Sequence, residues 1–565
     1  MTDVIVALSV MFIVAGVLLL VANHFGFSPI PFYIIAGLLV GPFIAQENLI
    51  EFAQWGIAFL VFVFGIRLDV SDIQGVLRDA EVAALVQILV VGALAFGVGY
   101  GFGYLFEFDD PVRNAIYFSA AATLSSTIVG SGVLQRSILD NLVYGRLASS
   151  IHFFDDIVAI GLILVLSAEL LTDTQAITSN IGYGVLFLLA GLFMARHGYP
   201  LLVRAAEGFD ELVLMGSISI LIAFIAAAEA IGISIVIGAF AAGIAIGKEG
   251  AVSIGVENGI NSIRDFFVAI FFVTIGALVS IQSIEILLLA GALALLVLVV
   301  NPIIIMLAFI YEGYDTRTSF LAALSLNQMS ELSLIIAIEA WFLGTISDRL
   351  FDAIILAAVL TMLVTVVTKR YEDALYKRLI SGPFGKWESQ SVNRNSEVAE
   401  DISDHVIIVG YGRQGRQLAK RLEEIGEQCV VIENDPVLKE EVTRDCTNYV
   451  FGDAMATHTM EQANVSDARL VISTVSYKPV SRSLLELETD ADLILRAQNS
   501  EIAKEYLDEG VLFVNVPSVL ASDNLVEQVR RVLEDNEEIT ALQEQHNKAL
   551  DTLERYGFQT KFDNP

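Results

Sequence analysis

Two adjacent carboxylates, Asp155 and Asp156, lie inside the long apolar run Ser149–Leu171. An ionised carboxylate is costly in hydrocarbon, so acids inside such a run mark ion or proton sites. They follow the start of the predicted helix by about nine residues, which is a depth of roughly 14 Å at 1.5 Å per residue. A carboxylate there can hold a proton or a small cation but not both, which is the basis of an exchange reaction. The alternative is a pair of protonated acids that only join helices.

Two further apolar segments are interrupted by polar residues near their middles. The first is "ATLSSTIVG" and the second is "LSLNQMSELSLI". Backbone freed by a broken helix is tolerated at membrane depth only where it faces protein or a polar cavity. One interruption is explained by hydrogen bonding between helices, whereas two in oppositely directed segments favour an inverted-repeat transporter with crossing half-helices. The polar residues are Thr123, Ser125, Ser126 and Thr127 in the first segment, and Asn327, Gln328, Ser330 and Glu331 in the second.

A third pattern with chemistry is the glycine-rich turn Gly410–Gly415, which reads G-x-G-x-x-G. It follows a predicted strand (Val406–Val409) and opens a predicted helix (Gln414–Ile425). Such glycines let the backbone approach a pyrophosphate at a helix N-terminus, where free N–H groups favour anions. Glu433 comes at the end of the next predicted strand, Cys429–Ile432, where it can accept a hydrogen bond from a ribose hydroxyl.

Two more predicted strands, Val450–Ala454 with Asp453 at its carboxyl end and Leu470–Thr474, would face the same crevice. The predicted nucleotide-binding residues are therefore Gly410, Gly412, Arg413, Gln414, Gly415, Glu433 and Asp453. The alternative is a nucleotide-binding fold that has lost its ligand and only dimerises.

The elements that position these residues are predicted from the hydropathy of the chain. Its 565 residues are 55% hydrophobic and only 17% charged, and a membrane helix needs about 20 apolar residues. Thirteen spans are predicted: Val4–Val21, Pro29–Ala45, Phe52–Gly65, Val82–Leu105, Val112–Leu134, Leu147–Leu171, Ile181–Ala195, Leu212–Ala228, Ile231–Ile246, Phe266–Ser280, Ile284–Ile310, Phe320–Leu343 and Phe351–Thr368.

The charges of the loops predict the orientation, because cytoplasmic loops are enriched in Lys and Arg. With the N-terminus outside, only Arg113 and Arg349 fall in outer loops. The inner loops then carry Arg67, Arg78, Arg136, Arg146, Arg196, Arg204, Lys248, Arg264, Arg317 and the Lys369–Lys386 cluster. The first span lacks the basic start of a signal peptide, so we expect a retained helix and a multi-pass protein of the cell membrane.

A second, cytoplasmic domain is predicted after a polar linker at residues 379–404. The Rossmann-like α/β domain would cover residues 405–522, and an acidic helical tail residues 523–565. The tail has an apolar face (Leu525, Val529, Val532 and Leu533) that suits either a subunit contact or a solvated cap. Cys429 and Cys446 form no C-x-x-C motif, so we expect buried thiols in a reducing compartment and no metal site. The net charge of −32 argues against nucleic acid as a partner.

These motifs together resemble the monovalent cation:proton antiporter-2 family, in particular its Kef-type members with a C-terminal nucleotide-binding regulatory domain. The matching stretches are "LSSTIV", "FFDDIVAI", "FFVTIGALV" (Phe271–Val279), "NQMSELSLII" and "GYGRQG". The resemblance implies a homodimeric, elevator-type exchanger of about thirteen helices with inverted repeats. It also implies a regulator-of-potassium-conductance domain, of the TrkA-N type, that binds AMP or NAD(H) as a regulatory ligand rather than a redox cofactor.

By the same resemblance, Asp156 would bind K⁺ or Na⁺ and a proton in turn, with Asp155 as its partner position. Ser125, Ser126 and Thr127 would line the crossing, and Gln328 and Glu331 would lie near the other broken helix. One position departs from the family pattern, because several relatives carry a lysine in the eleventh span where this chain has Asn301. Asp155 is then expected to stay protonated or to help hold the ion.

Two functions from other classes stay open on these residues. A membrane-anchored NAD-dependent dehydrogenase would use the glycine-rich turn for catalysis, but the soluble part is short for an added substrate domain. A nucleotide-gated channel would pass cations without linked proton movement. The acid pair and the two interrupted helices favour exchange over a channel, and the protein is predicted not to be an enzyme.

Overall fold

The structure is a computed structural model and describes residues 2–43, 46–67, 73–127, 129–130, 134, 142–166, 174–247, 254–280, 283–380 and 396–534. The chain divides into two compact units. The first comprises Met1–Glu312 and Thr318–Leu379, and the second comprises Gly313–Arg317 and Ile380–Pro565.

In the part that the structure describes, the first unit is built of helices without a β-strand, and each of the thirteen predicted spans overlaps one or two of these helices. Six of the described segments are long and apolar enough to cross a membrane without interruption, the longest being Ile284–Glu312. The helices are α1 (Thr2–Phe25), α2 (Pro29–Val40), α3 (Gln46–Arg67), α4 (Ile73–Val86), α5 (Gly92–Leu105), α6 (Pro111–Thr123), α8 (Val143–Leu166), α9 (Thr174–Phe193), α10 (Tyr199–Ala205), α11 (Asp210–Ile231), α12 (Ile235–Ile246), α13 (Ile254–Leu278), α14 (Ile284–Leu295), α15 (Asn301–Glu312), α16 (Thr316–Leu324), α17 (Glu331–Phe342), α18 (Asp348–Arg370) and α19 (Glu372–Leu379).

Three of these spans contain a π-helical segment that joins two α-helices, at Gln87–Val91, Met194–Gly198 and Leu296–Val300. A π-turn inserts one extra residue per turn and is frequent at functional sites. The first begins at Gln87, a buried polar residue inside an otherwise apolar stretch.

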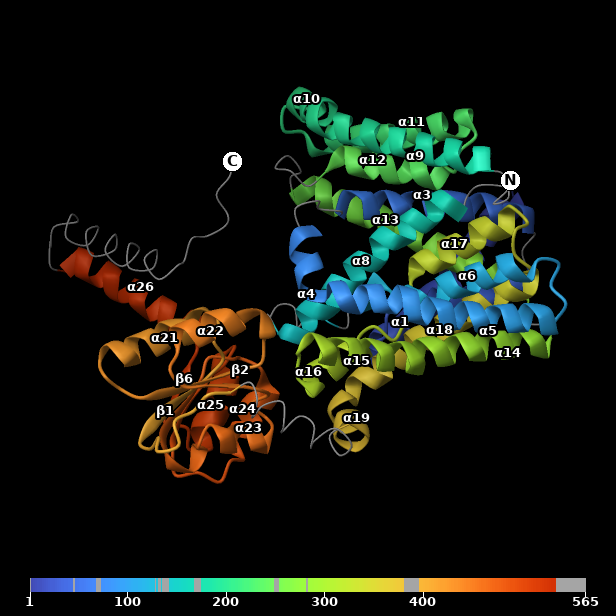
Figure 1. The fold of residues 1–565 in the computed structure, drawn as a ribbon. Helices are drawn as coiled ribbons and strands as arrows, with labels where there is room; N and C mark the ends of the chain where they lie inside the picture. Colours follow the sequence, from blue (N-terminus) through green and yellow to red (C-terminus); the bar gives the residue numbers. More distant parts are fainter. Residues whose placement is uncertain are drawn as a thin grey trace. The chain divides into compact units, whose positions relative to one another are not determined.

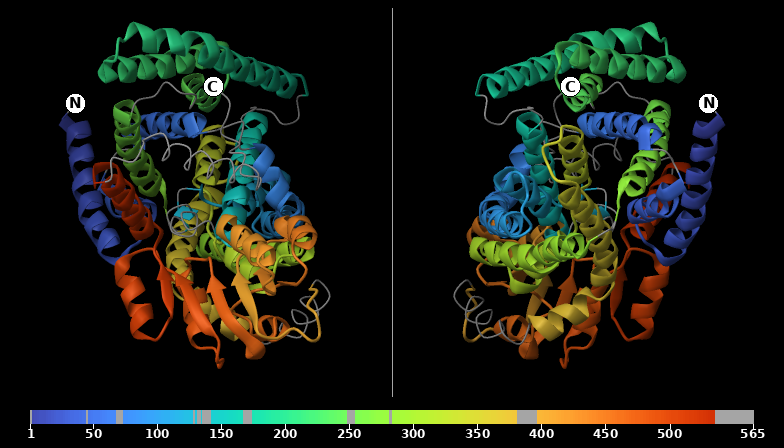
Figure 2. Two further views of the ribbon diagram at one scale, coloured as in Figure 1. Left: turned by 90° about the vertical axis from the view of Figure 1, so that its left-hand side faces the viewer. Right: turned by 90° about the vertical axis from the view of Figure 1, so that its right-hand side faces the viewer.

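Pairs of glycines bring neighbouring helices into close contact. A Cβ added at Gly37 of α2 would lie 2.0 Å from the Val273 carbonyl oxygen, and one at Gly276 of α13 would lie 2.0 Å from that of Ile34. Small residues are the usual solution for helix packing in lipid, where apolar burial alone does not bring helices together. In Figure 2 the segments between Thr174 and Ile231, teal to green, stand together at one edge of this helical unit.

The two predicted interruptions are present, and they give the first unit an internal repeat. α6 ends at Thr123 and α16 ends at Leu324, and in each case extended backbone follows before a helix resumes. The starts of α6 and α16 are 205 residues apart, and so are the starts of α8 and α18. This equal spacing is what a repeated helical unit produces.

The second unit is a six-stranded parallel sheet in the order β3-β2-β1-β4-β5-β6. This is the doubly wound order of nucleotide-binding folds, with its reversal between β1 and β4. Its elements are β1 (His405–Val409), α21 (Arg413–Glu424), β2 (Cys429–Glu433), α22 (Lys439–Asp445), β3 (Tyr449–Phe451), α23 (Thr457–Gln462), β4 (Ala468–Ser473), α24 (Lys478–Leu485), β5 (Asp492–Arg496), α25 (Ser500–Asp508), β6 (Phe513–Asn515) and α26 (Pro517–Glu534).

Helices cover both faces of this sheet, as Figure 1 shows. On one face Ala419 of α21 and Val442 of α22 pack on Val406 and Ile408, whereas on the other face Leu484 of α24 packs with the alternate residues of the strands. Double coverage explains why these strands read as continuous apolar runs rather than alternating ones.

Element boundaries differ from the prediction by a few residues. The third strand ends at Phe451, so Asp453 lies two residues beyond it rather than inside it. α26 runs across residue 523, where we predicted the acidic tail to begin, and it exposes Leu525 and Val529. The side chains of Val532 and Leu533, and the predicted tail after residue 534, lie outside the described residues, as do residues 381–395 of the predicted linker.

Candidate functional site

The two interrupted helices meet at their extended segments. Ser125 and Met329 form an antiparallel bridge, with the Ser330 amide 3.0 Å from the Leu124 carbonyl and the Ser126 amide 3.3 Å from the Gln328 carbonyl. The backbone groups that each helix end leaves without a partner are thus bonded across the crossing. This crossing is also where α8 brings its acid pair.

Asp155 faces the first broken segment and is 1% exposed. Its Oδ2 accepts hydrogen bonds from the backbone amide of Ser125 (2.9 Å), from the Ser125 hydroxyl and from Nε2 of Gln87 (3.2 Å). Its Oδ1 has no hydrogen-bond partner among the described residues. One oxygen is therefore held by three donors while the other is left as a free acceptor.

Asp156 reaches the same segment two residues further along, and its Oδ1 accepts from the Thr127 hydroxyl at 2.8 Å. The 100° turn between adjacent helical residues explains why the two carboxylates contact different residues of one short segment. The Ser126 hydroxyl donates instead to Glu331, the first residue of α17, so that it links the two interrupted helices. An acid at that helix N-terminus is favourably placed against the helix dipole.

The structure brings together seven of the eight residues predicted for the ion site: Asp155, Asp156, Ser125, Ser126, Thr127, Gln328 and Glu331. Gln328 joins them through Nε2, which donates to the Ser126 carbonyl at 3.2 Å. Asn301 is 1% exposed, but no side-chain hydrogen bond joins it to another residue in the part of the chain that the structure describes. Asn301 therefore makes no hydrogen bond to Asp155 in place of the lysine that several relatives are expected to carry in this span.

Two site residues were missed from the sequence, Gln87 and His152. Gln87 Nε2 donates both to Asp155 and to the carbonyl of Thr123, the last residue of α6, so it satisfies a helix end and an acid together. His152 lies one turn before Asp155 on α8, and its Nδ1 is 3.1 Å from the Ser125 hydroxyl. The available signal was a lone glutamine in the apolar run of Gln87 and a histidine three residues before the acid pair, and both patterns also fit ordinary buried side chains.

In the second unit, the glycine-rich turn lies where the strand order reverses. Gly410 has a φ of +92°, which favours glycine, and a Cβ at Gly415 would lie 1.8 Å from the Gly410 carbonyl oxygen. Gly412, in contrast, has nothing within 4 Å of an added Cβ. It caps α21 without a side-chain hydrogen bond, which leaves the first amides of a 12-residue helix available to an anion.

Glu433 ends β2 beside this turn and is 7% exposed. Its Oε2 accepts from the Tyr411 amide at 2.6 Å, and its Oε1 accepts from the amides of Asn434 and Asp435. Burial raises the pKa of Glu433, while these amide donors act in the opposite direction. A carboxylate has about four acceptor positions, so one is left for a ribose hydroxyl.

The remaining predicted nucleotide residues lie around the same carboxyl edge of the sheet. Asp453 accepts from the Met455 amide at 2.9 Å, Arg413 begins α21, and the Gln414 side-chain oxygen accepts from Arg496 at 3.3 Å. Arg496 ends β5 and also donates to the Thr474 carbonyl. Sequence reasoning missed this arginine, which only the pairing of β5 beside β4 brings to the turn. The residues present therefore fit a nucleotide with an anionic phosphate.

Comparison with known proteins agrees with both halves of the fold. Residues 9–370 match the family described as sodium/hydrogen exchanger, transmembrane, and residues 406–517 match the TrkA-N domain. "Putative K(+) efflux antiporter KefB" of Alkalimonas amylolytica is 26% identical over 89% of this chain and 77% of its own length. "Putative cation/proton antiporter YbaL" of Escherichia coli (strain K12) is 25% identical, over 89% of this chain and 91% of its own length.

A solved structure, that of the sodium proton antiporter MjNhaP1 from Methanocaldococcus jannaschii, is 17% identical with a TM-score of 0.49. It covers 66% of this chain and 98% of that chain. The family match to residues 9–370 spans more than half of the sequence and confirms the family expected from the motifs. The chain therefore belongs to the sodium/hydrogen exchanger family of multi-pass membrane proteins, the cation/proton antiporters, and carries a TrkA-N domain in its second half.

Proposed function

We propose that this protein exchanges K⁺ or Na⁺ for protons by alternating access, with Asp156 binding the cation and the proton in competition. The observation that carries the proposal is the buried acid pair at the crossing of two interrupted helices, where hydroxyl and amide donors hold Asp155 and the Thr127 hydroxyl donates to Asp156. Since a single carboxylate cannot hold both ions, loading one releases the other.

Several buried oxygens around the crossing accept no hydrogen bond from the described residues, which suits the binding of a cation in exchange for the proton. Among the described residues, Oδ1 of Asp155, Oε1 of Gln87 and Oε1 of Gln328 are buried and accept no hydrogen bond. Hard cations bind oxygen ligands, and a buried acceptor without a partner is otherwise costly. Gln87 donates a hydrogen bond to Asp155 Oδ2, as a basic partner would, but it adds no positive charge.

The test is proton movement in proteoliposomes that contain a pH dye, driven by added Na⁺ or K⁺. We expect the wild type to release or take up protons with one of the two cations and Asp156→Asn to lose this coupling. The matched control is Asp352→Asn, which removes another buried carboxylate of the first unit, one that accepts from the Ser280 amide away from the crossing. Unchanged exchange by Asp156→Asn would refute the assignment, and cation flux without proton movement would show a channel.

We propose further that the TrkA-N domain binds AMP or NAD(H) and regulates exchange. The open space at Gly412 supports this, because nothing in the chain itself demands glycine there, whereas an approaching phosphate would. We expect Gly412→Ala to leave folding unchanged and to weaken nucleotide binding at least about tenfold in calorimetry. Gly426→Ala is the control for a glycine outside the turn: its positive φ means that alanine lowers stability, while nucleotide affinity should stay as in wild type. Failure of AMP, ATP and NAD(H) to bind the wild type would remove the ligand-binding proposal.

The orientation and assembly complete the proposal. The basic loops support an outer N-terminus and a cytoplasmic second unit. A homodimer follows from the family resemblance, and native mass spectrometry of the purified protein tests it by the mass of the complex.

A further inference from the structure

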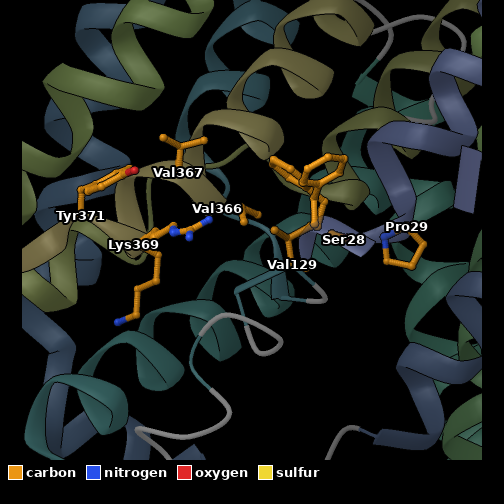
Figure 3. A pocket seen from close by; sticks show the side chains of 11 residues that line it. Ser28, Pro29, Val129, Val366, Val367, Lys369 and Tyr371 are labelled. Atoms are coloured by element: carbon orange, nitrogen blue, oxygen red, sulfur yellow. The ribbon is translucent and has the colours of Figure 1, made fainter. Parts of the chain in front are cut away.

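A cavity of about 750 Å³ lies in the first unit, and neither acid of the pair is among its lining residues. Its walls come from the turn between α1 and α2, from Val129 just beyond the crossing, and from the C-terminal end of α18. Figure 3 shows Lys369 and Tyr371 on one side, Ser28 and Pro29 across from them, and Val129 between. The volume is within the range of cavities that hold small ligands.

The wall formed by α18 carries positive charge. Lys369 pairs with Glu372 at 2.6 Å and lies 4.8 Å from the ring centre of Tyr144. The side chain of Arg370, the last residue of α18, makes no hydrogen bond or ion pair with any residue that the structure describes. The Arg370 guanidinium therefore has no acidic partner among the described residues. It lies beside the Lys369 ammonium, which is paired with Glu372.

The other walls are apolar and open. Phe25 is 62% exposed and Val367 is 47% exposed, and Phe27 lies beside them on the turn. An inorganic anion needs no such surface, whereas an anionic molecule with a hydrocarbon part would cover it. A cavity with positive charge at one end and apolar walls is complementary to an amphiphile that has an anionic group and a hydrocarbon part.

The position of the cavity narrows the class of amphiphile to a membrane lipid. α18 is the last membrane-length helix, and its end is followed by more basic residues on α19, Lys377 and Arg378. Basic pockets between membrane helices on the cytoplasmic side bind anionic headgroups, and anionic lipids are enriched there. We propose that this cavity binds an anionic phospholipid, with its phosphate at Arg370 and Lys369 and its acyl chains along Phe25, Phe27 and Val367.

A lipid bound there would contact both the α1–α2 turn and the C-terminal end of α18. The turn leads into α2, which packs on α13, whereas the Thr361 hydroxyl of α18 accepts a hydrogen bond from the Met329 amide of the crossing. If the lipid binds one arrangement of these helices more tightly than another, it stabilises the first by the difference in binding free energy. This effect on exchange and the cytoplasmic placement of the cavity rest on the proposed function, whereas the charge and the apolar walls of the cavity do not.

The experiment uses the full-length protein in detergent, with palmitoyl-oleoyl phosphatidylglycerol, phosphatidylcholine of the same chains, and inorganic phosphate as separate probes. Lipid retention in native mass spectrometry and the unfolding temperature are the readouts. We expect phosphatidylglycerol alone to be retained and to raise the unfolding temperature. Arg370→Gln should lower its affinity about fivefold, the effect of one basic residue, with Arg370→Lys restoring most of it. Arg204→Gln on α10, an arginine that does not line the cavity, is the matched control and should change nothing.

Four results would overturn the proposal. Equal retention of phosphatidylglycerol and phosphatidylcholine, or wild-type retention by Arg370→Gln, would show that no charged headgroup binds at this cavity. Equal stabilisation by inorganic phosphate would show a site for free anions. A change in cation half-saturation for Arg370→Gln in pure phosphatidylcholine vesicles would make the cavity an ion entrance. Proton coupling in wild type is measured in the same vesicles, so failure of the proposed exchange is seen separately.

Discussion

His152 is the residue that connects Ser125 to a second side chain on α8. The one hydroxyl hydrogen of Ser125 is directed to Asp155, so the contact at 3.1 Å is made by Nδ1–H of His152 donating to the Ser125 oxygen. Nε2 then carries no hydrogen, and it has no partner among the described residues. His152 therefore holds Ser125 in the rotamer that serves Asp155, without touching the acid itself.

His152→Leu should consequently lower exchange at limiting cation by about fivefold or more, because Ser125 loses the donor that orients it. His152→Asn keeps an N–H donor near the position of Nδ1 and should stay within about twofold of wild type, whereas His152→Gln should not. Half-saturation and maximal rate in proteoliposomes are measured for each variant. Equal losses in the Asn and Leu variants would show that the residue only fills space.

The two cysteines of the second unit should be unreactive in the folded protein. Burial raises the pKa of Cys446 to about 11 and that of Cys429 to about 12, and each side chain is 6% exposed. At pH 8.5 a thiol whose pKa is raised from 9 to about 11 has about 100-fold less thiolate. We expect alkylation by iodoacetamide to be slow when folded and rapid in denaturant, as followed by mass spectrometry.

The same shifts predict how stability depends on pH. The folded thiols keep their protons between pH 9 and about 11 to 12, while the unfolded thiols lose them, so the folded state binds more protons in that window. Their contribution therefore leaves stability unchanged below pH 9 and lowers it as pH rises above 9. A Cys429→Ala, Cys446→Ala variant should lose less stability over that range than wild type in chemical unfolding.

At the scale of elements, the close approach of α2 and α13 depends on glycine. A Cβ at Gly276 would meet the backbone of Ile34, which cannot move aside as a flexible side chain can. Gly276→Ala should therefore separate the helices or strain them, at a cost of about 1–3 kcal/mol, and lower the unfolding temperature. Gly291→Ala in α14 meets nothing within 4 Å and is the control. If both variants unfold together with wild type, the helices are not held by this contact.

The interrupted helices were predictable, whereas their pairing was not. Polar residues in the middle of two membrane-length runs indicated the breaks, because helical backbone is broken in lipid only for a reason. The bridge between Ser125 and Met329 joins residues more than 200 positions apart, and no local pattern encodes such a contact. Gln87 became visible only when a π-turn placed its amide between α6 and Asp155.

At the scale of the whole molecule, nucleotide and cation binding are expected to be coupled. If the nucleotide changes the affinity for the cation by some factor, thermodynamic linkage requires the cation to change nucleotide affinity by the same factor. We expect a change of about 5- to 150-fold in each direction, measured as equilibrium dissociation constants of the full-length protein. Gly412→Ala should require at least about tenfold more nucleotide for the same effect on the cation, while the cation affinity without nucleotide stays as in wild type. Two factors that differ in wild type would mean that the sites are not linked at equilibrium.

The sequence by itself determined the class of the protein. Runs of apolar residues predict membrane spans from hydropathy alone, and the glycine fingerprint between two apolar strands predicts a nucleotide fold, because both depend on residues near one another in the chain. Asp155 and Asp156 stood out for the same reason, as charges in an apolar run.

Only the tertiary structure decided which groups those residues meet. Asp155 accepts hydrogen bonds from Ser125 and Gln87, and Ser126 donates to Glu331 rather than to the acid pair. Asn301 takes no part in the hydrogen bonds of the crossing among the described residues. Likewise Arg496 reaches the glycine-rich turn only through the order of the strands. These contacts follow from the packing of distant segments, where hydrogen bonds must be satisfied in three dimensions rather than along the chain.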